Sequence, residues 1–142
     1  MTFAIKQIGP QLWSQRFSSL AHESAFGEKK NWDDRIDYAL LSINENEEPC
    51  GYVTCRELDS KIVRWQYGGM FEPVRDTIYS MKIYEEFINW MRNRYEAISF
   101  YVENTNKVML KFAMKSGFLI TGIRNYQGNI LLEHLMEFKN GN

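Results

Sequence analysis

The sequence lacks the features that mark a disulfide scaffold, a membrane span or a nucleic-acid surface. Cys50 and Cys55 are the only cysteines among 142 residues, and five positions apart on a strand they would point to opposite faces, so we expect free thiols in a reducing compartment. No apolar run approaches the length of a membrane helix, and the opening MTFAIKQIGP has no long apolar signal segment. The net charge is −1 and the basic residues are dispersed, so no nucleic-acid partner is expected. We therefore expect a soluble, cytoplasmic protein that binds no membrane.

Histidine is equally scarce, and this limits the chemistry. His22 and His134 stand alone in the sequence, with no third ligand and no nucleophile at a useful spacing. Neither a Walker loop nor a dinucleotide fingerprint occurs. We expect no metal site and no catalytic triad.

The composition is that of an ordinary globular chain with many aromatic residues. Hydrophobic residues make up 44% of the sequence, charged residues 25% and aromatic residues 15%. A chain of this length buries a substantial core without disulfides or metal. There is no linker, repeat or low-complexity segment, so we expect a single domain over 1–142.

Hydrophobic periodicity predicts an alternation of strands and helices. A period of two predicts strands at 3–8, 37–43, 51–58, 61–71, 97–103, 118–124 and 130–138. Helical spacing predicts a helix after Pro10, with Leu12, Trp13, Phe17 and Leu20 on one face, and helices at 77–94 and 106–116. The polar segment 23–35 reads as a short second helix or a loop. The helix between strands 61–71 and 97–103 makes that pair parallel by a right-handed crossover.

Glycines interrupt the strand at 61–71. Gly68 and Gly69 lie inside it, and Pro73 ends its pairing because proline has no N–H to donate. Glycine inside a strand marks a bulge or a close approach to the backbone. We expect a bulged strand at this point.

The stretch 101–118 joins a strand to a capped helix. Ile98, Phe100 and Val102 form the apolar face of the strand, and either Thr105 or Asn104 is expected to cap the helix. Gly117 suits the left-handed conformation that ends a helix.

The spacing from Asn106 to Gly117-Phe118 resembles the C-terminal half of the GNAT superfamily of acetyl-CoA-dependent N-acyltransferases. The order of elements is similar to that family over nearly the whole chain. The resemblance implies an α+β fold with a mixed, mostly antiparallel central sheet and helices on both faces. It also implies that the bulged strand and the strand after the crossover splay apart, with acyl-CoA in the gap.

The same resemblance implies where acetyl-CoA binds as co-substrate. In the family, an Arg or Gln followed by spaced glycines presents backbone N–H groups to the pyrophosphate before a helix. Arg75 and Ser80 match the ends of that pattern, whereas Asp76 and Ile78 replace the usual glycines. The implied contacts lie at the end of the bulged strand, in this loop and at the start of the last helix: Met70, Phe71, Arg75, Thr77, Ile78, Tyr79, Ser80 and Asn106. Two alternatives stay open, a helix that Asp76 caps itself and an Asn106 that bonds its own backbone.

The proton donor of many family members is a tyrosine four residues before the terminal glycine, and here that position is Ala113. Glu72, Tyr101 and Glu103 are the polar residues nearest the implied thioester, so we take them as catalytic candidates. For the two glutamates, a solvated surface position is the alternative.

We therefore expect an N-acyltransferase that moves an acetyl group from acetyl-CoA to a primary amine of a small molecule or protein by direct attack. The acceptor would enter over 23–35, where Trp32, Asp33 and Asp34 suit a cation. The alternative is a GNAT-like binding or assembly module that no longer catalyses. The oligomeric state stays open, with a homodimer as one alternative.

Overall fold

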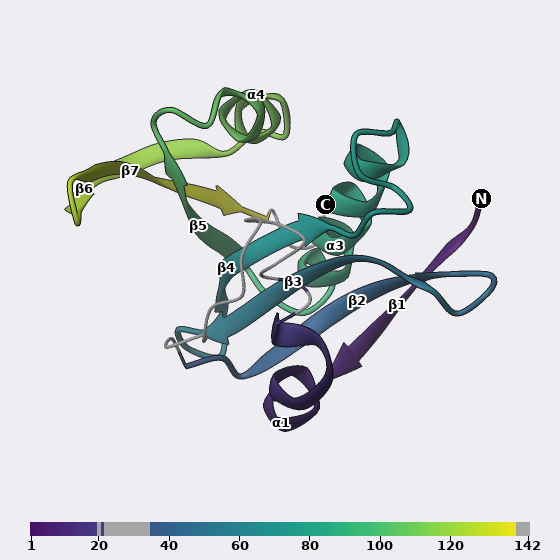
Figure 1. Ribbon diagram of the computed structural model, residues 1–142. Coiled ribbons are helices and arrows are strands. Elements are labelled where there is room, and N and C mark those ends of the chain that lie inside the picture. Colours follow the sequence, from purple (N-terminus) through teal and green to yellow (C-terminus); the bar gives the residue numbers. More distant parts are fainter. Residues whose placement is uncertain (20, 22–34, 139–142) are drawn as a thin grey trace. The chain divides into compact units, whose positions relative to one another are not determined.

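The computed structural model describes residues 1–19, 21 and 35–138 (Figure 1). The predictions for Leu20, His22 and the segment 23–34 fall outside the described residues. The chain divides into two compact units: unit 1 comprises Met1–Arg56 and Trp65–Asn93, and unit 2 comprises Glu57–Arg64 and Arg94–Asn142. The expectation of one domain over the whole chain stays a prediction.

The predicted strands are confirmed with small shifts at their ends. Their bounds are β1 Phe3–Ile8, β2 Tyr38–Asn44, β3 Pro49–Glu57, β4 Ile62–Met70, β5 Ala97–Glu103, β6 Leu119–Tyr126 and β7 Asn129–Glu137. Hydrogen bonds connect these seven described strands in the order β1-β2-β3-β4-β5-β7-β6. The β4–β5 pair is parallel, as the crossover requires, and β1–β2, β2–β3, β5–β7 and β6–β7 are antiparallel. The architecture is the expected α+β fold with a mixed, mostly antiparallel sheet.

The helices begin and end close to their predicted positions. They are α1 Pro10–Leu12, the π-helical turn η1 Trp13–Phe17, α3 Tyr79–Arg92 and α4 Lys107–Lys115. One prediction was wrong in detail, because α1 and η1 do not continue as one regular α-helix. The wider turn keeps Trp13 buried, whereas Leu12 is exposed instead of lying on the buried face.

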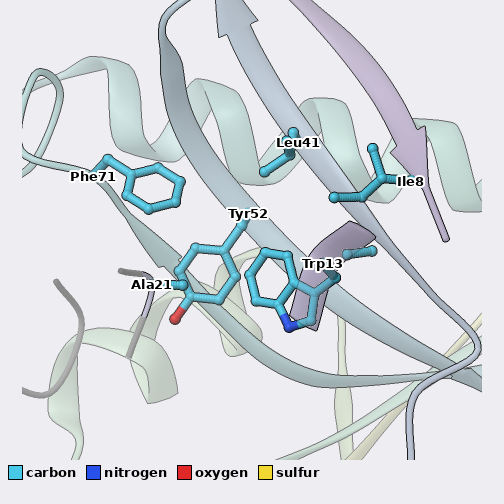
Figure 2. Close-up of a cluster of buried hydrophobic side chains, with 7 residues drawn as sticks. Ile8, Trp13, Ala21, Leu41, Tyr52 and Phe71 are labelled. Carbon is cyan, nitrogen blue, oxygen red and sulfur yellow. The ribbon is translucent and has the colours of Figure 1, made fainter. Parts of the chain in front are cut away.

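In unit 1, both faces of the sheet are covered. On one face, Ile8, Leu41 and Tyr52 pack with Trp13 and Phe71 in a buried cluster (Figure 2). The ring centroids of Trp13 and Tyr52 lie 5.2 Å apart.

The opposite face of the unit 1 sheet is covered by α3 (Figure 1). Gly51 of β3 lies on this face, where an added Cβ would lie 2.9 Å from Cγ2 of Ile83 in α3. Tyr38 of β2 contacts Trp90 of α3 at 5.7 Å between ring centroids. Successive residues of each strand therefore face opposite sides of the sheet, as the period of two requires. One set packs in the cluster around Trp13, and the other packs against α3.

In unit 2, α4 begins and ends at polar caps. The N-cap is Asn106, whose side-chain oxygen accepts a hydrogen bond from the N–H of Met109 at 3.3 Å, so the prediction of Thr105 or Asn104 was wrong by one or two positions. Gly117 has a φ of 91°, which confirms its predicted role at the end of the helix. Phe118, which follows α4, meets the buried Phe100 of β5 at 4.5 Å between centroids.

The predicted bulge lies in β4, slightly before the two glycines. The indole of Trp65 packs on α3 against Tyr84 and Phe87. A Cβ on Gly68 would lie 2.5 Å from Nε1 of that indole, so positions 65 and 68 face the same side of the sheet. In a regular strand, residues three positions apart face opposite sides. Between them, the N–H of Tyr67 donates to the side-chain Oγ1 of Thr54 at 3.1 Å. Gly68 is therefore needed to make room for Trp65.

Replacing Gly68 tests this explanation. Gly68→Ala should lower the free energy of unfolding by about 1–3 kcal/mol, because the new methyl group displaces a packed indole. Gly9→Ala is the matched control, since an added Cβ there meets no atom within 4 Å. Urea unfolding of both variants measures the difference. Equal stability of the two would show that Trp65 moves aside without cost.

Candidate active site

Hydrogen bonding between β4 and β5 is confined to their first residues. Ile62, Val63 and Arg64 pair with Ala97, Ile98 and Ser99, and the register ends there. Gly68 and Met70, later in β4, therefore have no ladder with β5. A strand that is paired on one side only can accept an extended chain along its other side. The pairing of β4 with β5 thus ends at Arg64 and Ser99.

In unit 1, the turn between β4 and α3 takes the backbone conformation that glycine usually supplies. Asp76 has a φ of 60°. The N–H groups of Asp76 and Ile78 form no hydrogen bond with the described residues, whereas the N–H of Thr77 donates to the carbonyl of Val74 at 3.1 Å. Unbonded N–H groups around a left-handed residue are typical of an anion-binding backbone nest. Asp76, which replaces the usual glycine, therefore keeps the left-handed backbone conformation but adds a carboxylate.

The first turn of α3 is not capped by Asp76, so that alternative was wrong. Oγ1 of Thr77 accepts from the N–H of Tyr79 at 3.2 Å and donates to the carbonyl of Val74 at 2.6 Å. The N-cap residue Ile78 makes no side-chain cap and is 85% exposed. Arg75 and Asp76 are exposed beside it.

In unit 2, the N-cap of α4 and one residue inside the helix bear on the predicted chemistry. Asn106 bonds its own helix through its side-chain oxygen, as the second alternative stated, which leaves its amide N–H₂ group for other partners. Ala113 is fully buried and offers no proton.

The three catalytic candidates have different surroundings. Glu72 follows β4 in unit 1, and Glu103 ends β5 in unit 2; both are exposed, and their carboxylates have no hydrogen bond or ion pair with described residues. Tyr101 of β5 is half-buried, and the guanidinium of Arg64 lies 4.7 Å from its ring centroid.

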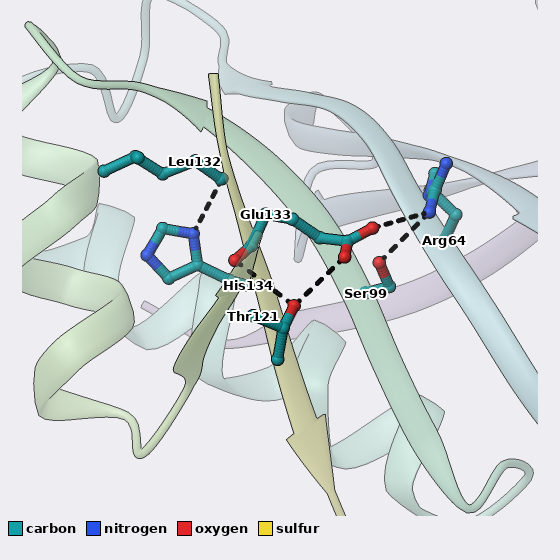
Figure 3. A network of polar contacts seen from close by, with 6 residues as sticks. All are labelled: Arg64, Ser99, Thr121, Leu132, Glu133 and His134. Carbon is teal, nitrogen blue, oxygen red and sulfur yellow. Dashed lines mark hydrogen bonds and ion pairs between the residues drawn. The ribbon is translucent and has the colours of Figure 1, made fainter. Parts of the chain in front are cut away.

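Arg64 belongs to a polar network in unit 2 that the sequence did not reveal. Its Nη2 contacts Glu133 at 3.3 Å and Ser99 at 3.4 Å, and Glu133 accepts from Thr121 at 3.0 Å (Figure 3). Only pairing across four strands brings these side chains together, so no sequence spacing marks them. The network fixes Arg64 at the residue where the β4–β5 pairing ends.

The buried Tyr52 and the half-buried Tyr84 of unit 1 were also missed, because nothing in the sequence distinguishes them from other core aromatics. Burial raises the pKa of Tyr84 to about 12 and also raises the pKa of Tyr52. The Tyr52 hydroxyl is buried and has no hydrogen-bond partner among the residues that the structure describes. Neither phenol ionises near neutral pH, so neither serves as a tyrosinate base.

A surface pocket of unit 1 has none of these residues in its lining. It measures about 190 Å³ and lies in unit 1 between β1, β2 and the α1–η1 segment, with Ile8, Leu41 and Phe17 in its walls. It is smaller than the roughly 300–1,000 Å³ of typical ligand sites and contains no predicted site residue.

No group of three metal-ligating side chains occurs in the part of the chain that the structure describes. The buried His134 stacks on Phe100, with Nδ1 3.0 Å from the carbonyl of Leu132.

Comparisons with known proteins identify the fold. No family profile and no curated protein matches the sequence. Solved structures do match. The ribosomal-protein-S18-alanine N-acetyltransferase of Escherichia coli has a TM-score of 0.74 at 8% identity, over 99% of this chain and 97% of that chain. The chain has the GNAT fold.

Two further matches carry the same fold. The spermidine/spermine N-acetyltransferase SpeG of Vibrio cholerae, in mutant forms, has a TM-score of 0.73 at 9% identity, over 96% of this chain and 95% of that chain. A GNAT family acetyltransferase of Elizabethkingia anophelis with acetyl-CoA bound has a TM-score of 0.65 at 16% identity, over 96% and 98%. None of the described helices of this GNAT-fold chain is long and apolar enough to span a membrane.

The left-handed backbone at Asp76 leads to a stability prediction. Asp76→Ala should be less stable than Asp76→Gly by about 1 kcal/mol, because glycine adopts this φ at no cost whereas alanine is strained. Chemical denaturation of the two variants measures the difference. If alanine equals glycine, the turn does not hold position 76 in the left-handed region.

Proposed function

We propose that the chain is an acetyl-CoA-dependent N-acetyltransferase that acts on a primary amine of a small molecule or a protein. The observation that carries this proposal is the end of the β4–β5 pairing after Arg64 and Ser99, in a chain with the GNAT fold. It leaves the bulged part of β4 ready to bind an extended pantetheine arm. The E. anophelis protein of the same fold has acetyl-CoA bound, which supports this choice of co-substrate.

The residues of unit 1 fit such a ligand through backbone groups. The N–H groups of Asp76 and Ile78, which have no partner in the described chain, suit an oxygen of the pyrophosphate. Arg75 adds positive charge in the same loop, next to Thr77, Tyr79 and Ser80. Met70 would offer main-chain partners to the pantetheine amides. Phe71 is less suited to this role, because its N–H donates to the carbonyl of Cys50 at 2.9 Å and its carbonyl accepts from the N–H groups of Val74 and Arg75. In unit 2, the amide N–H₂ group of Asn106 would donate to the same arm.

Acetyl-CoA supplies an activated acetyl group as a thioester. The reaction needs a neutral amine, because an ammonium nitrogen has no lone pair to form the new C–N bond. The C–S bond breaks, and the departing sulfur takes up a proton. No covalent enzyme intermediate is needed, which agrees with the lack of a persuasive nucleophile in the sequence.

The exposed carboxylates are the groups proposed to take the amine proton. Glu72 or Glu103 would act as general base through a water molecule, since neither is held by another side chain. Tyr101, polarised by the neighbouring guanidinium of Arg64, would orient the reacting groups through its hydroxyl. The return of a proton to the sulfur is left to solvent, because Ala113 supplies none.

A second function has specific support. The carboxylate of Asp76, the exposed Ile78 and the buried Ala113 each oppose one part of the enzyme proposal. A GNAT-fold module that binds or assembles without catalysis would tolerate all three. Affinity for acetyl-CoA separates the two functions more directly than a search for substrates.

We expect calorimetry to give a micromolar dissociation constant for acetyl-CoA, about −8 kcal/mol. The reason is that contacts along β4 do not depend on the altered loop. No heat and no thermal shift at millimolar ligand would end the enzyme proposal.

Asp76→Asn is the internal control for this measurement. Asparagine also tolerates a left-handed φ, so the backbone of the turn is kept while the charge is removed. Affinity should rise roughly two- to fivefold if the carboxylate opposes the pyrophosphate. Weaker binding at unchanged stability would mean that Asp76 helps to hold the ligand.

The proton assignment is tested by Glu72→Gln and Glu103→Gln. Replacing the true base should lower kcat about a hundredfold with little change in acetyl-CoA affinity, because a general base contributes in the transition state. Glu85→Gln, an exposed position on α3, is the matched control. Steady-state kinetics with an amine acceptor measures the effect. Full activity in both variants would assign the proton to solvent.

A further inference from the structure

The last strand of the sheet order, β6, is an exposed edge in unit 2. It runs from Leu119 to Tyr126 and pairs with β7 on one side only. Natural proteins protect such edges with proline, inward-pointing charge or a covering element. β6 has no proline, and its single charged residue is Arg124. Its outer row of backbone groups is a template for another strand.

The side chains of this edge are apolar on both faces of the sheet. Ile123 is 76% exposed and Leu119 is 71% exposed. The register against β7 places Leu119, Gly122, Arg124 and Tyr126 on the face of Glu133, and Ile120, Ile123 and Asn125 on the face of His134. Most of the large apolar side chains that are exposed in the described chain lie between Val108 and Ile130. A monomer rarely leaves so much apolar surface in one region.

The charges along the edge are complementary to those of a second copy. Arg124 has no carboxylate partner among the described residues and contacts only the rings of Tyr101 and Tyr126, at 5.9 and 5.6 Å from their centroids. Glu133 lies one strand inward, beside Gly122. A Cβ built on Gly122 would lie 3.5 Å from Oε1 of Glu133, so the missing side chain leaves this carboxylate reachable from the edge.

Strand symmetry limits the possible registers, and the charges favour one of them. Directly opposed residues of an antiparallel pair share a face, so a two-fold axis must pass through a residue and not between two. An axis at Arg124 would oppose like charges, which destabilises pairing. An axis at Ile123 opposes Ile123 with its copy and puts Arg124 opposite Gly122, next to Glu133 of the second copy. With the bulge residue Thr121 skipped, as it is against β7, Leu119 also meets Tyr126 on a common face.

We propose that two copies of this chain associate through antiparallel β6–β6 pairing, with Ile123 on the two-fold axis and Arg124 of each copy beside Glu133 of the other. The interface is isologous and closes, so it predicts a dimer and not a filament. It removes the open edge and covers the apolar side chains of β6. This proposal does not depend on the proposed enzymatic activity.

Light scattering coupled to gel filtration of the full chain tests the dimer. We expect a mass twice the chain mass of 16.9 kDa. Ile123→Asp should weaken dimerisation at least about tenfold, because two carboxylates then oppose each other. Val108→Asp is the matched control, since Val108 is 70% exposed on α4 and lies outside β6. A monomeric wild type, or equal effects of the two variants, would overturn the proposal.

Cross-linking and a glycine substitution test the register. Ile123→Cys should form a disulfide-linked dimer under mild air oxidation with a copper catalyst, whereas Val108→Cys should not. The wild-type chain, whose Cys50 and Cys55 are both buried, gives the background level of cross-linking. Gly122→Val should weaken the dimer by occupying the place of Arg124, while circular dichroism reports an intact fold. An undiminished dimer with Gly122→Val, or no cross-link through Cys at 123, would overturn the proposed register.

Discussion

The packing of one indole against one glycine shapes the central strand of this protein. Trp65 occupies the space that a side chain at position 68 would fill, and the backbone between them departs from regular alternation. Bulges bend a strand and end its pairing. The departure follows directly after Arg64, the last residue of β4 that pairs with β5. Contacts of Arg64 with Ser99 and Glu133 fix the other side of that boundary. The proposed binding edge depends on this interruption.

In the loop before α3, the backbone conformation at position 76 suits an anion, whereas the side chain at that position opposes one. A left-handed residue is needed at position 76, and aspartate supplies it because its short polar side chain tolerates that conformation better than most. Thr77 then takes over the capping of the helix. The N–H groups needed for an anion are thus preserved, and the same substitution adds a negative charge where an anion would bind. This conflict is what distinguishes the loop from a loop of spaced glycines.

Unit 2 combines an interior network with an exposed edge. On the inner strands, Glu133 is bonded to Arg64 and Thr121, while on the outer strand Arg124 has no carboxylate partner among the described residues. Glycine at position 122 lies between these two environments. A carboxylate that is reachable from the edge, and an arginine whose N–H groups have no acceptor there, suit a symmetric partner better than they suit an isolated chain.

The sequence by itself determined the order of elements, the parallel crossover, the bulge, the helix start at Pro10 and the helix end before Gly117. Periodicity and the conformational limits of proline and glycine are local properties, so a sequence contains them. The tertiary structure decided what local patterns do not contain. It assigned Gly68 to the packing of Trp65, moved the α4 cap to Asn106, replaced capping by Asp76 with capping by Thr77, and assembled Arg64, Ser99 and Glu133 from three strands. These outcomes depend on contacts between residues distant in sequence, which strand pairing and close packing create.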